Sequence, residues 1–312
     1  MVYQRQKVLL ALLRRTPDRR AFKTQLIKWL FLLREEENLD KYVSFYNFFP
    51  YKYGPFSFLA NKDISELERF GCIKSDSDFL QYTALEKDSA YFDLPSNIML
   101  CIERVFRNYG KLSTTDLINY IYESYPWYAS RSKIRQLDLL RNSSKPKLAI
   151  YSLGYECLTI DGFLDEVLKA GIKVVIDSRN NPISRKYGFS KSFLASRCSD
   201  VGINYYQFSE IGIPSEFRNQ ADNKQDLWNF YLKEILPRNS KSLKLIGDIC
   251  KSNPSVLICF EKDPNNCHRH ILAKELSLMT NLPIIHFMEG RWNDLGRESK
   301  NSYNCQDLSY TI

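Results

Sequence analysis

Short apolar segments alternate with amphipathic segments over the second half of the chain, and this alternation constrains the fold more than any other feature. Apolar runs without polar alternation predict buried strands at 148–153, 173–176, 203–208, 255–260 and 284–287. Helical periodicity between them predicts helices at 160–170, 192–201, 225–236, 242–251 and 268–279, with Gly171 and Gly202 as C-terminal caps. Strand–helix alternation of this kind predicts an α/β fold, a parallel (Rossmann-like) sheet with helices on both faces.

The N-terminal residues 1–95 predict a mainly helical domain of the winged-helix type. Apolar stripes predict two helices at the start of the chain and a third through Ile64, Leu67 and Phe70, and residues 71–74 and 80–83 then predict a hairpin. This order is typical of winged-helix modules, in which the hairpin and one helix usually contact DNA. The aromatic segment 43–56 allows another interpretation, a core that docks the module onto the second domain.

Residues 96–146 predict a helical extension followed by a linker. Two apolar stripes lie within 98–121, and Ser113 is placed as an N-cap between them. The polar run 141–146 has no apolar periodicity and ends in Pro, which marks a domain boundary. The predicted domains are therefore 1–95, 96–146 and 147–312.

The charge balance favours an anionic partner for the N-terminal half. Net charge is +8; residues 1–146 hold 23 basic and 17 acidic residues, against 21 and 19 in 147–312. This bias is compatible with DNA or RNA as a partner and too small to require one. The nucleic-acid-binding candidates are basic and aromatic residues of this half: Lys52, Tyr53, Lys74, Arg131 and Lys133.

Several classes of protein are excluded or disfavoured by composition. The 8 cysteines form no CxxC pair and the N-terminus lacks a signal-peptide pattern, which predicts reduced thiols in a cytoplasmic protein. No apolar run approaches the roughly 20 residues that span a bilayer, so no membrane partner is expected. With only 3 histidines, a multi-histidine metal centre is not expected, and no cofactor is predicted.

Ionisable residues follow the predicted strands, where parallel sheets bind their ligands. After the first strand come Tyr155 and Glu156, and after the fourth comes Glu261. The loop after the second strand begins with Asp177 and Arg179. The remaining candidates in these loops and the helix starts beside them are Ser184, Arg185, Lys191, Cys267, His268 and Arg269. Crowded charges of this kind predict a site for an anionic or nucleotide ligand, in which the arginines hold the anion.

The motifs at these positions resemble a known family. They are Leu153-Gly154-Tyr155-Glu156, Asp177-Ser178-Arg179-Asn180-Asn181-Pro182, Ile211-Gly212-Ile213-Pro214 and Glu261-Lys262-Asp263-Pro264 with Cys267-His268-Arg269. In this order, over about residues 148–290, they resemble the domain of unknown function 488, a family whose resemblance implies a shared strand-end site without naming its reaction. Cys157 and Ser178 stand where the family often has Gly and Val. The N-terminal region loosely resembles YwgA-like, phage-associated winged-helix proteins.

The candidate catalytic residues each have a structural alternative. Glu261 is the preferred acid/base, because a carboxylate at a buried strand end tends to titrate high. Asp177 is placed in acid/base or ribose-hydroxyl contact, or in a salt bridge to Arg179 or Arg185. Cys267 is a nucleophile near a helix start or simply a buried small side chain.

His268 is the fourth catalytic candidate, and its position is ambiguous in the same way. It either orients a phosphate and shuttles protons or caps the helix. Neither role is distinguished by the sequence.

Two functions from different classes follow. The first is a nucleic-acid-associated protein whose α/β domain binds a nucleotide or phosphate-bearing ligand and carries hydrolytic or glycosyl-transfer chemistry. The second is a non-catalytic DNA-binding regulator or antiphage-defence sensor, in which a small anionic effector binds the same loops. The sequence gives no indication of oligomeric state.

Overall fold

The computed structural model describes residues 2–83, 93–134, 146–220, 223–288 and 290–292. Contacts within the chain divide it into two compact units, Met1–Ser143 and Ser144–Ile312. Each unit has its own sheet and its own core, so each is described by itself.

The second unit is built on a six-stranded, mostly parallel sheet. Its strands are β6 (Ile150–Gly154), β7 (Val174–Asp177), β8 (Asn204–Gln207), β9 (Ser255–Cys259), β10 (Ile284–Met288) and β11 (Arg291–Trp292). They are ordered β11-β10-β6-β9-β7-β8, and only β11 runs antiparallel to its neighbour. The parallel sheet predicted from the five apolar runs is confirmed, and β11 is an addition that the sequence pattern did not indicate.

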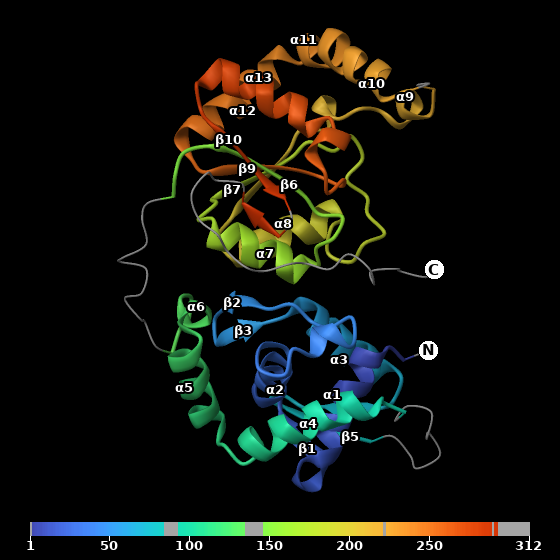
Figure 1. The fold of residues 1–312 in the computed structure, drawn as a ribbon, viewed down its shortest axis with the longest axis vertical. Helices are drawn as coiled ribbons and strands as arrows, with labels where there is room; N and C mark the ends of the chain where they lie inside the picture. Colours follow the sequence, from blue (N-terminus) through green and yellow to red (C-terminus); the bar gives the residue numbers. More distant parts are fainter. Residues whose placement is uncertain (1, 84–92, 135–145, 221–222, 289, 293–312) are drawn as a thin grey trace. The chain divides into compact units, whose positions relative to one another are not determined.

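Helices cover both faces of this sheet, with α7 and α8 on one side and α12 and α13 on the other (Figure 1). The α-helices are α7 (Ile160–Lys169), α8 (Lys191–Asp200), α9 (Ser215–Gln220), α10 (Lys224–Phe230), α11 (Leu236–Arg238), α12 (Ser240–Ser252) and α13 (Arg269–Thr280). A π-helical turn, Tyr231–Ile235, interrupts the helical segment between α10 and α11. Gly171 and Gly202 follow α7 and α8 with φ of +66° each, which confirms them as helix terminators.

The two faces of the sheet receive different side chains from each strand. Ile176 and Leu257 pack with Ile246 and Leu272 in the core beneath α12 and α13. Successive side chains of a strand point to opposite faces, so Cys259 shares the face of Leu257, whereas Asp177 takes the face opposite to that of Ile176.

The first unit combines helices with two small antiparallel sheets. Its elements are α1 (Gln4–Arg15), β1 (Arg20–Phe22), α2 (Lys23–Glu35), β2 (Phe49–Tyr51), β3 (Gly54–Phe56), α3 (Phe58–Arg69), β4 (Ile73–Ser75) and β5 (Phe79–Tyr82). One sheet has the order β1-β5-β4, and the other is the β2-β3 hairpin. The three predicted helices and the predicted hairpin, β4 with β5, are present.

The helical segment after residue 95 belongs to the same compact unit. It contains α4 (Ser96–Tyr109), α5 (Thr114–Ser124) and α6 (Pro126–Ala129). Ser113 caps α5 by accepting a hydrogen bond from the backbone N–H of Asp116, as the sequence indicated. The aromatic segment contributes Phe45, Tyr46 and Phe49 to the buried interior of this unit.

The structure tests two expectations that were drawn from composition, on membrane-spanning helices and on the state of the cysteines. Among the helices of the described ranges, none is both long and apolar enough to cross a membrane. Six cysteines are free and buried: Cys72, Cys101, Cys198, Cys250, Cys259 and Cys267. Cys157 is disulfide-bonded, so the prediction of reduced thiols is corrected at that residue.

Candidate functional site

The ionisable residues at the strand ends form two clusters rather than one. Asp177 and Arg179 lie with Tyr205 on the α8 face of the sheet, whereas Cys259 and Cys267 lie at the start of α13 on the opposite face. The expectation of one shared group of carboxylates and arginines is therefore corrected. Its physical cause is the alternation of side chains along each strand, because Asp177 is in register with Ile258 and not with Cys259.

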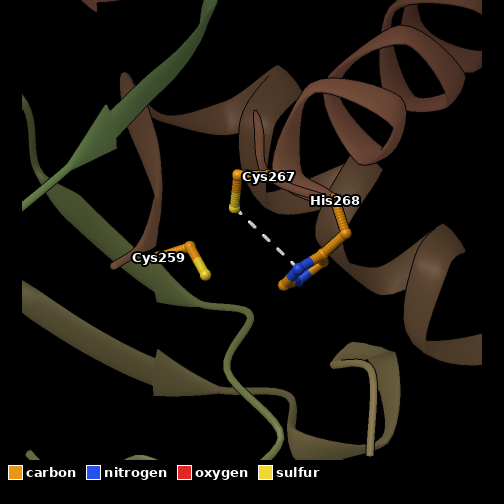
Figure 2. Close-up of side chains that lie close together, drawn as sticks. All are labelled: Cys259, Cys267 and His268. Carbon is orange, nitrogen blue, oxygen red and sulfur yellow. Dashed lines mark hydrogen bonds between the residues drawn. The ribbon is translucent and has the colours of Figure 1, made fainter. Parts of the chain in front are cut away.

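The thiol cluster, which we define as Cys259, Cys267 and His268, is the most unusual chemical feature of the unit (Figure 2). Cys259 is the last residue of β9. A tight turn, η7 (Pro264–Asn266), capped by the side chain of Asp263, then returns the chain to the start of α13. All three side chains are buried, and their ligand atoms lie within 4.8 Å of one another.

The ring orientation of His268 is defined by two contacts. Its Nε2 lies 3.1 Å from the backbone carbonyl oxygen of Ser178, and its Nδ1 lies 3.9 Å from Sγ of Cys267. A carbonyl oxygen can only accept, so Nε2 carries a hydrogen. In the neutral imidazole, the lone pair on Nδ1 is then directed at the Cys267 thiol and can accept its proton, which leaves a charged ring beside a thiolate.

The two cysteines of the cluster titrate in opposite directions. Burial alone raises the pKa of the Cys267 thiol, but its hydrogen bond with Cys259 and the adjacent charge of His268 outweigh burial and place that pKa well below its usual range. The same hydrogen bond, together with burial, raises the pKa of Cys259. The arrangement thus favours a Cys267 thiolate beside a protonated Cys259.

Glu261 lies next to the thiol cluster. Sγ of Cys259 lies 3.3 Å from Oε2 of Glu261, within hydrogen-bond distance. Burial raises the pKa of Glu261, and the charge of Cys267 raises it further. Glu261 therefore holds a proton more readily than an exposed carboxylate, which suits a proton donor.

Tyr231 completes the surroundings of the cluster. Its ring centroid lies 5.1 Å from that of His268, and the charges of Cys267 and Cys259, after burial, raise the pKa of its hydroxyl. The side chain is fully buried, and within the described part of the chain its hydroxyl has no hydrogen-bond partner. A buried, unpaired hydroxyl costs free energy, so this position is unusual for a purely structural residue.

Arg269 stabilises the loop that carries the cluster. Its Nε–H donates to Oγ of Ser152 at 3.1 Å, and its guanidinium also donates to the backbone carbonyls of Glu261 and Lys262. The side chain is fully buried. In this structure Arg269 is therefore engaged by protein atoms, and its anion-binding role stays a prediction.

Arg179 is engaged in the same way on the other face. Its Nε–H donates to Oδ1 of Asp177 at 2.8 Å, and its Nη1 donates to the hydroxyl of Tyr155 and to the carbonyl of Phe189. The hydroxyl of Tyr205 donates to Oδ2 of Asp177 at 2.6 Å. The structural alternative for Asp177, a salt bridge to Arg179, is the one observed, and the donors of Arg179 are directed at protein atoms instead of a ligand.

The other predicted ligand-binding residues, which we call the rim residues, are Glu156, Ser184, Arg185 and Lys191. The carboxylate of Glu156 accepts from the backbone N–H of Lys262 at 2.8 Å, and the backbone N–H of Ser184 donates to Ser190. Arg185 and Lys191 are exposed. These two cations are the predicted anion-binding groups that face solvent.

Four of the five predicted nucleic-acid contacts come together in the first unit. Lys52 and Tyr53 form the exposed turn of the β2-β3 hairpin, and the backbone N–H of Lys133 donates to the carbonyl of Lys52 at 2.8 Å. Arg131 is two residues from Lys133 and is also exposed. Lys74 lies apart from them in β4, which belongs to the other sheet.

Sequence reasoning did not identify Cys259, Tyr231 or Tyr205 as site residues. The sequence pattern predicts Cys259 as a strand residue, and its place at the strand end, eight residues before Cys267, is the one signal that the two thiols meet. Tyr231 and Tyr205 gave no comparable signal, because their roles depend on tertiary contacts.

The thiol cluster is also the place where the described residues could hold a metal ion. Two thiols and one imidazole are ligands typical of zinc and other thiophilic ions. Neither the polar cluster around Asp177 nor the rim residues supply such a set.

Comparison with known proteins adds a family to this geometry. No curated protein and no solved structure matches the chain. The model of the family described as Domain of unknown function DUF488 matches residues 159–276, from the start of α7 into α13, and so includes the whole thiol cluster. The resemblance seen in the motifs is thereby confirmed for residues 159–276, which match the DUF488 family model.

Proposed function

We propose that the α/β unit is a cysteine-dependent hydrolase or transferase in which Cys267 is the nucleophile. The observation that carries this proposal is the orientation of His268, whose Nδ1 faces Sγ of Cys267 while its Nε2–H is held by the carbonyl of Ser178. A thiol next to an oriented imidazole is the arrangement that activates cysteine nucleophiles. The depressed pKa of Cys267 supports the same role.

The proposed reaction uses three side chains: Cys267 as the nucleophile, His268 as the base that faces its thiol, and Glu261 as the proton donor. The Cys267 thiolate attacks an electrophilic carbon of the substrate and forms a covalent intermediate, while the leaving group takes a proton from Glu261. Water or an acceptor molecule then attacks the intermediate and gives its proton back to Glu261, which releases the product and restores the thiolate. Arg179 and Arg269 are engaged inside the protein, so neither is assigned a substrate contact in this scheme.

The proposal is tested by alkylation of the native protein with iodoacetamide, followed by peptide mass spectrometry. A thiolate with a depressed pKa reacts at a nearly constant rate from pH 6 to pH 8, whereas an ordinary cysteine accelerates roughly 70-fold over that range. We expect Cys267 to react first and with the flat profile.

Cys250 is the matched control, because it is a free, buried cysteine of the same unit whose pKa burial raises to about 12. Replacement of His268 by Gln should slow labelling of Cys267 at pH 6 and leave that of Cys250 unchanged. Equal labelling of the two cysteines in the folded protein would refute the proposal.

A second candidate function is contact of the first unit with nucleic acid. We infer a winged-helix-type arrangement from the sheet order β1-β5-β4 together with α1, α2 and α3. The usual DNA-reading elements are poorly charged for this task, because α3 exposes Glu68 beside Arg69, and the β4-β5 turn contains Asp76 and Asp78. The exposed basic residues at the β2-β3 turn, Lys52, Arg131 and Lys133, are therefore the more favourable surface for contact with nucleic acid.

This candidate is tested by fluorescence anisotropy with duplex and single-stranded oligonucleotides at low salt. Replacement of Lys52 and Lys133 by Ala should weaken binding and reduce its salt dependence. The matched control is Lys74→Ala, an exposed lysine on the β4-β5 hairpin. Loss of binding in the control alone would transfer the contact to that hairpin and exclude the β2-β3 turn.

A further inference from the structure

We propose that Cys259, Cys267 and His268 form a binding site for one thiophilic divalent cation, with Zn²⁺ as the preferred ion. This inference goes beyond the proposed nucleophile, since it requires Cys259 and does not require a substrate. It also adds a form of control, because a bound ion would occupy the lone pair with which Cys267 attacks.

The spacing of the three donor atoms fits a single ion. Zinc binds thiolate sulfur at about 2.3 Å and imidazole nitrogen at about 2.0 Å, so sulfur and nitrogen on one tetrahedral ion are separated by roughly 3.6 Å. Sγ of Cys267 and Nδ1 of His268 are 3.9 Å apart, and the three ligand atoms lie within 4.8 Å of one another. Small side-chain rotations would bring all three to ligand distance.

The contacts around the donors are those of a metal site. Metal-binding histidines usually donate their second ring N–H to a carbonyl or carboxylate, which sets the tautomer and the ring plane. Nε2 of His268 makes this contact with the carbonyl of Ser178 at 3.1 Å and leaves Nδ1 for the ion. The backbone that carries Cys259 and Cys267 is held in turn by Arg269, through its bonds to the carbonyls of Glu261 and Lys262.

The hydroxyl of Tyr231 gives an independent indication that a ligand belongs here. It is completely buried beside the cluster, with no protein partner among the described residues. Three protein ligands leave one position of a tetrahedral zinc ion for a water molecule or an anion. Such a group would accept the hydrogen bond that Tyr231 can donate, and would remove the cost of burying an unpaired hydroxyl.

Charge balance is compatible with burial of the ion. Two thiolates neutralise one dication, and the imidazole binds as the neutral ring. Binding therefore displaces the proton of Cys259 and any proton on Cys267 into the solvent. No oxidant or reductant is involved, because zinc and both sulfurs keep their oxidation states.

The experiment uses the full chain, reduced, stripped of metal by a chelator and titrated with Zn²⁺. We expect about one zinc per chain by elemental analysis, release of protons on binding, and protection of Cys267 against iodoacetamide. Titration with Co²⁺ should produce the sulfur-to-cobalt charge-transfer absorption that reports cysteine ligation. This optical readout requires no variant and does not depend on catalysis.

Two variants locate the ion. Cys259→Ala should lose the bound zinc and the cobalt absorption, whereas Cys250→Ala, which removes a buried thiol of the same unit outside the cluster, should keep both. The proposal would be overturned if the chain failed to bind zinc, or if bound cobalt showed no sulfur-to-cobalt charge-transfer absorption. It would also be overturned if Cys259→Ala bound as much zinc as the unaltered chain. Selective alkylation of Cys267 in the metal-free protein would still support the nucleophile, so failures of the two proposals are distinguishable.

Discussion

The two faces of the α/β sheet carry polar clusters of opposite character at the same strand ends. On the α8 face, Asp177 receives hydrogen bonds from Arg179 and Tyr205, and the remaining donors of Arg179 reach Tyr155 and Phe189. On the α13 face, buried thiols and an imidazole meet beside a hydroxyl that has no partner among the described residues.

This difference separates stabilising residues from functional ones. A buried ion pair whose groups are all hydrogen-bonded leaves nothing for a ligand to complete. The thiol cluster has donors at ligand spacing and lies beside an unpaired buried hydroxyl, and that hydroxyl costs folding free energy. Residues that do not contribute to stability are retained most readily when they serve a function.

The largest effect is expected for the charge pair of the α8 face. Replacement of Arg179 by Met leaves the carboxylate of Asp177 buried without its cation, and this should cost about 3–5 kcal/mol in the free energy of unfolding. Cys267→Ser should cost less than about 1.5 kcal/mol, because the volume hardly changes. Native-state hydrogen exchange of the β7 and β9 amides measures both values for this unit alone.

The double variant Asp177→Asn, Arg179→Met is the control for that prediction. Removing both charges should recover part of the loss, because no uncompensated carboxylate remains. The comparison between the faces would be broken if Cys267→Ser destabilised the unit as much as Arg179→Met does. In that case the thiol cluster would be a structural core.

Sequence patterns predicted the strands and helices, but they did not predict which side chains meet at the strand ends. The five apolar runs predicted the parallel strands, because an unalternated run of this length is stable only when covered on both faces. The face on which a strand-end residue lies depends on one residue of register: β7 ends at Asp177, not at the predicted 176. As a strand residue, Asp177 directs its side chain to the face covered by α8, which separates it from Glu261.

The contacts of Arg269 and the local structure at Tyr231 could not be predicted from the sequence either. Arg269 reaches Ser152, which is 117 residues away along the chain, and no local pattern specifies such a contact. Tyr231 was expected inside a regular helix over 225–236, whereas the structure has a π-helical turn beginning at that residue. Turns of this kind often occur at functional sites, and their position depends on tertiary packing.

The next largest effect is expected for Tyr205 on the α8 face. Its hydroxyl donates to the buried carboxylate of Asp177 at 2.6 Å, a charge-assisted hydrogen bond. Tyr205→Phe should therefore lower the free energy of unfolding by about 1.5–2 kcal/mol, as measured by hydrogen exchange of β7 and β8. An unchanged stability would mean that Arg179 alone satisfies the carboxylate.

The smallest expected effect has the opposite sign and belongs to the α13 face. Tyr231→Phe removes a buried hydroxyl that has no partner in the described structure, so in metal-free protein the unit should become more stable by about 1 kcal/mol. Hydrogen exchange of the β9 and α13 amides in the presence of a chelator measures the change. A loss of stability would show that the hydroxyl is already satisfied within the protein, and Tyr231 would then join Tyr205 as a structural residue.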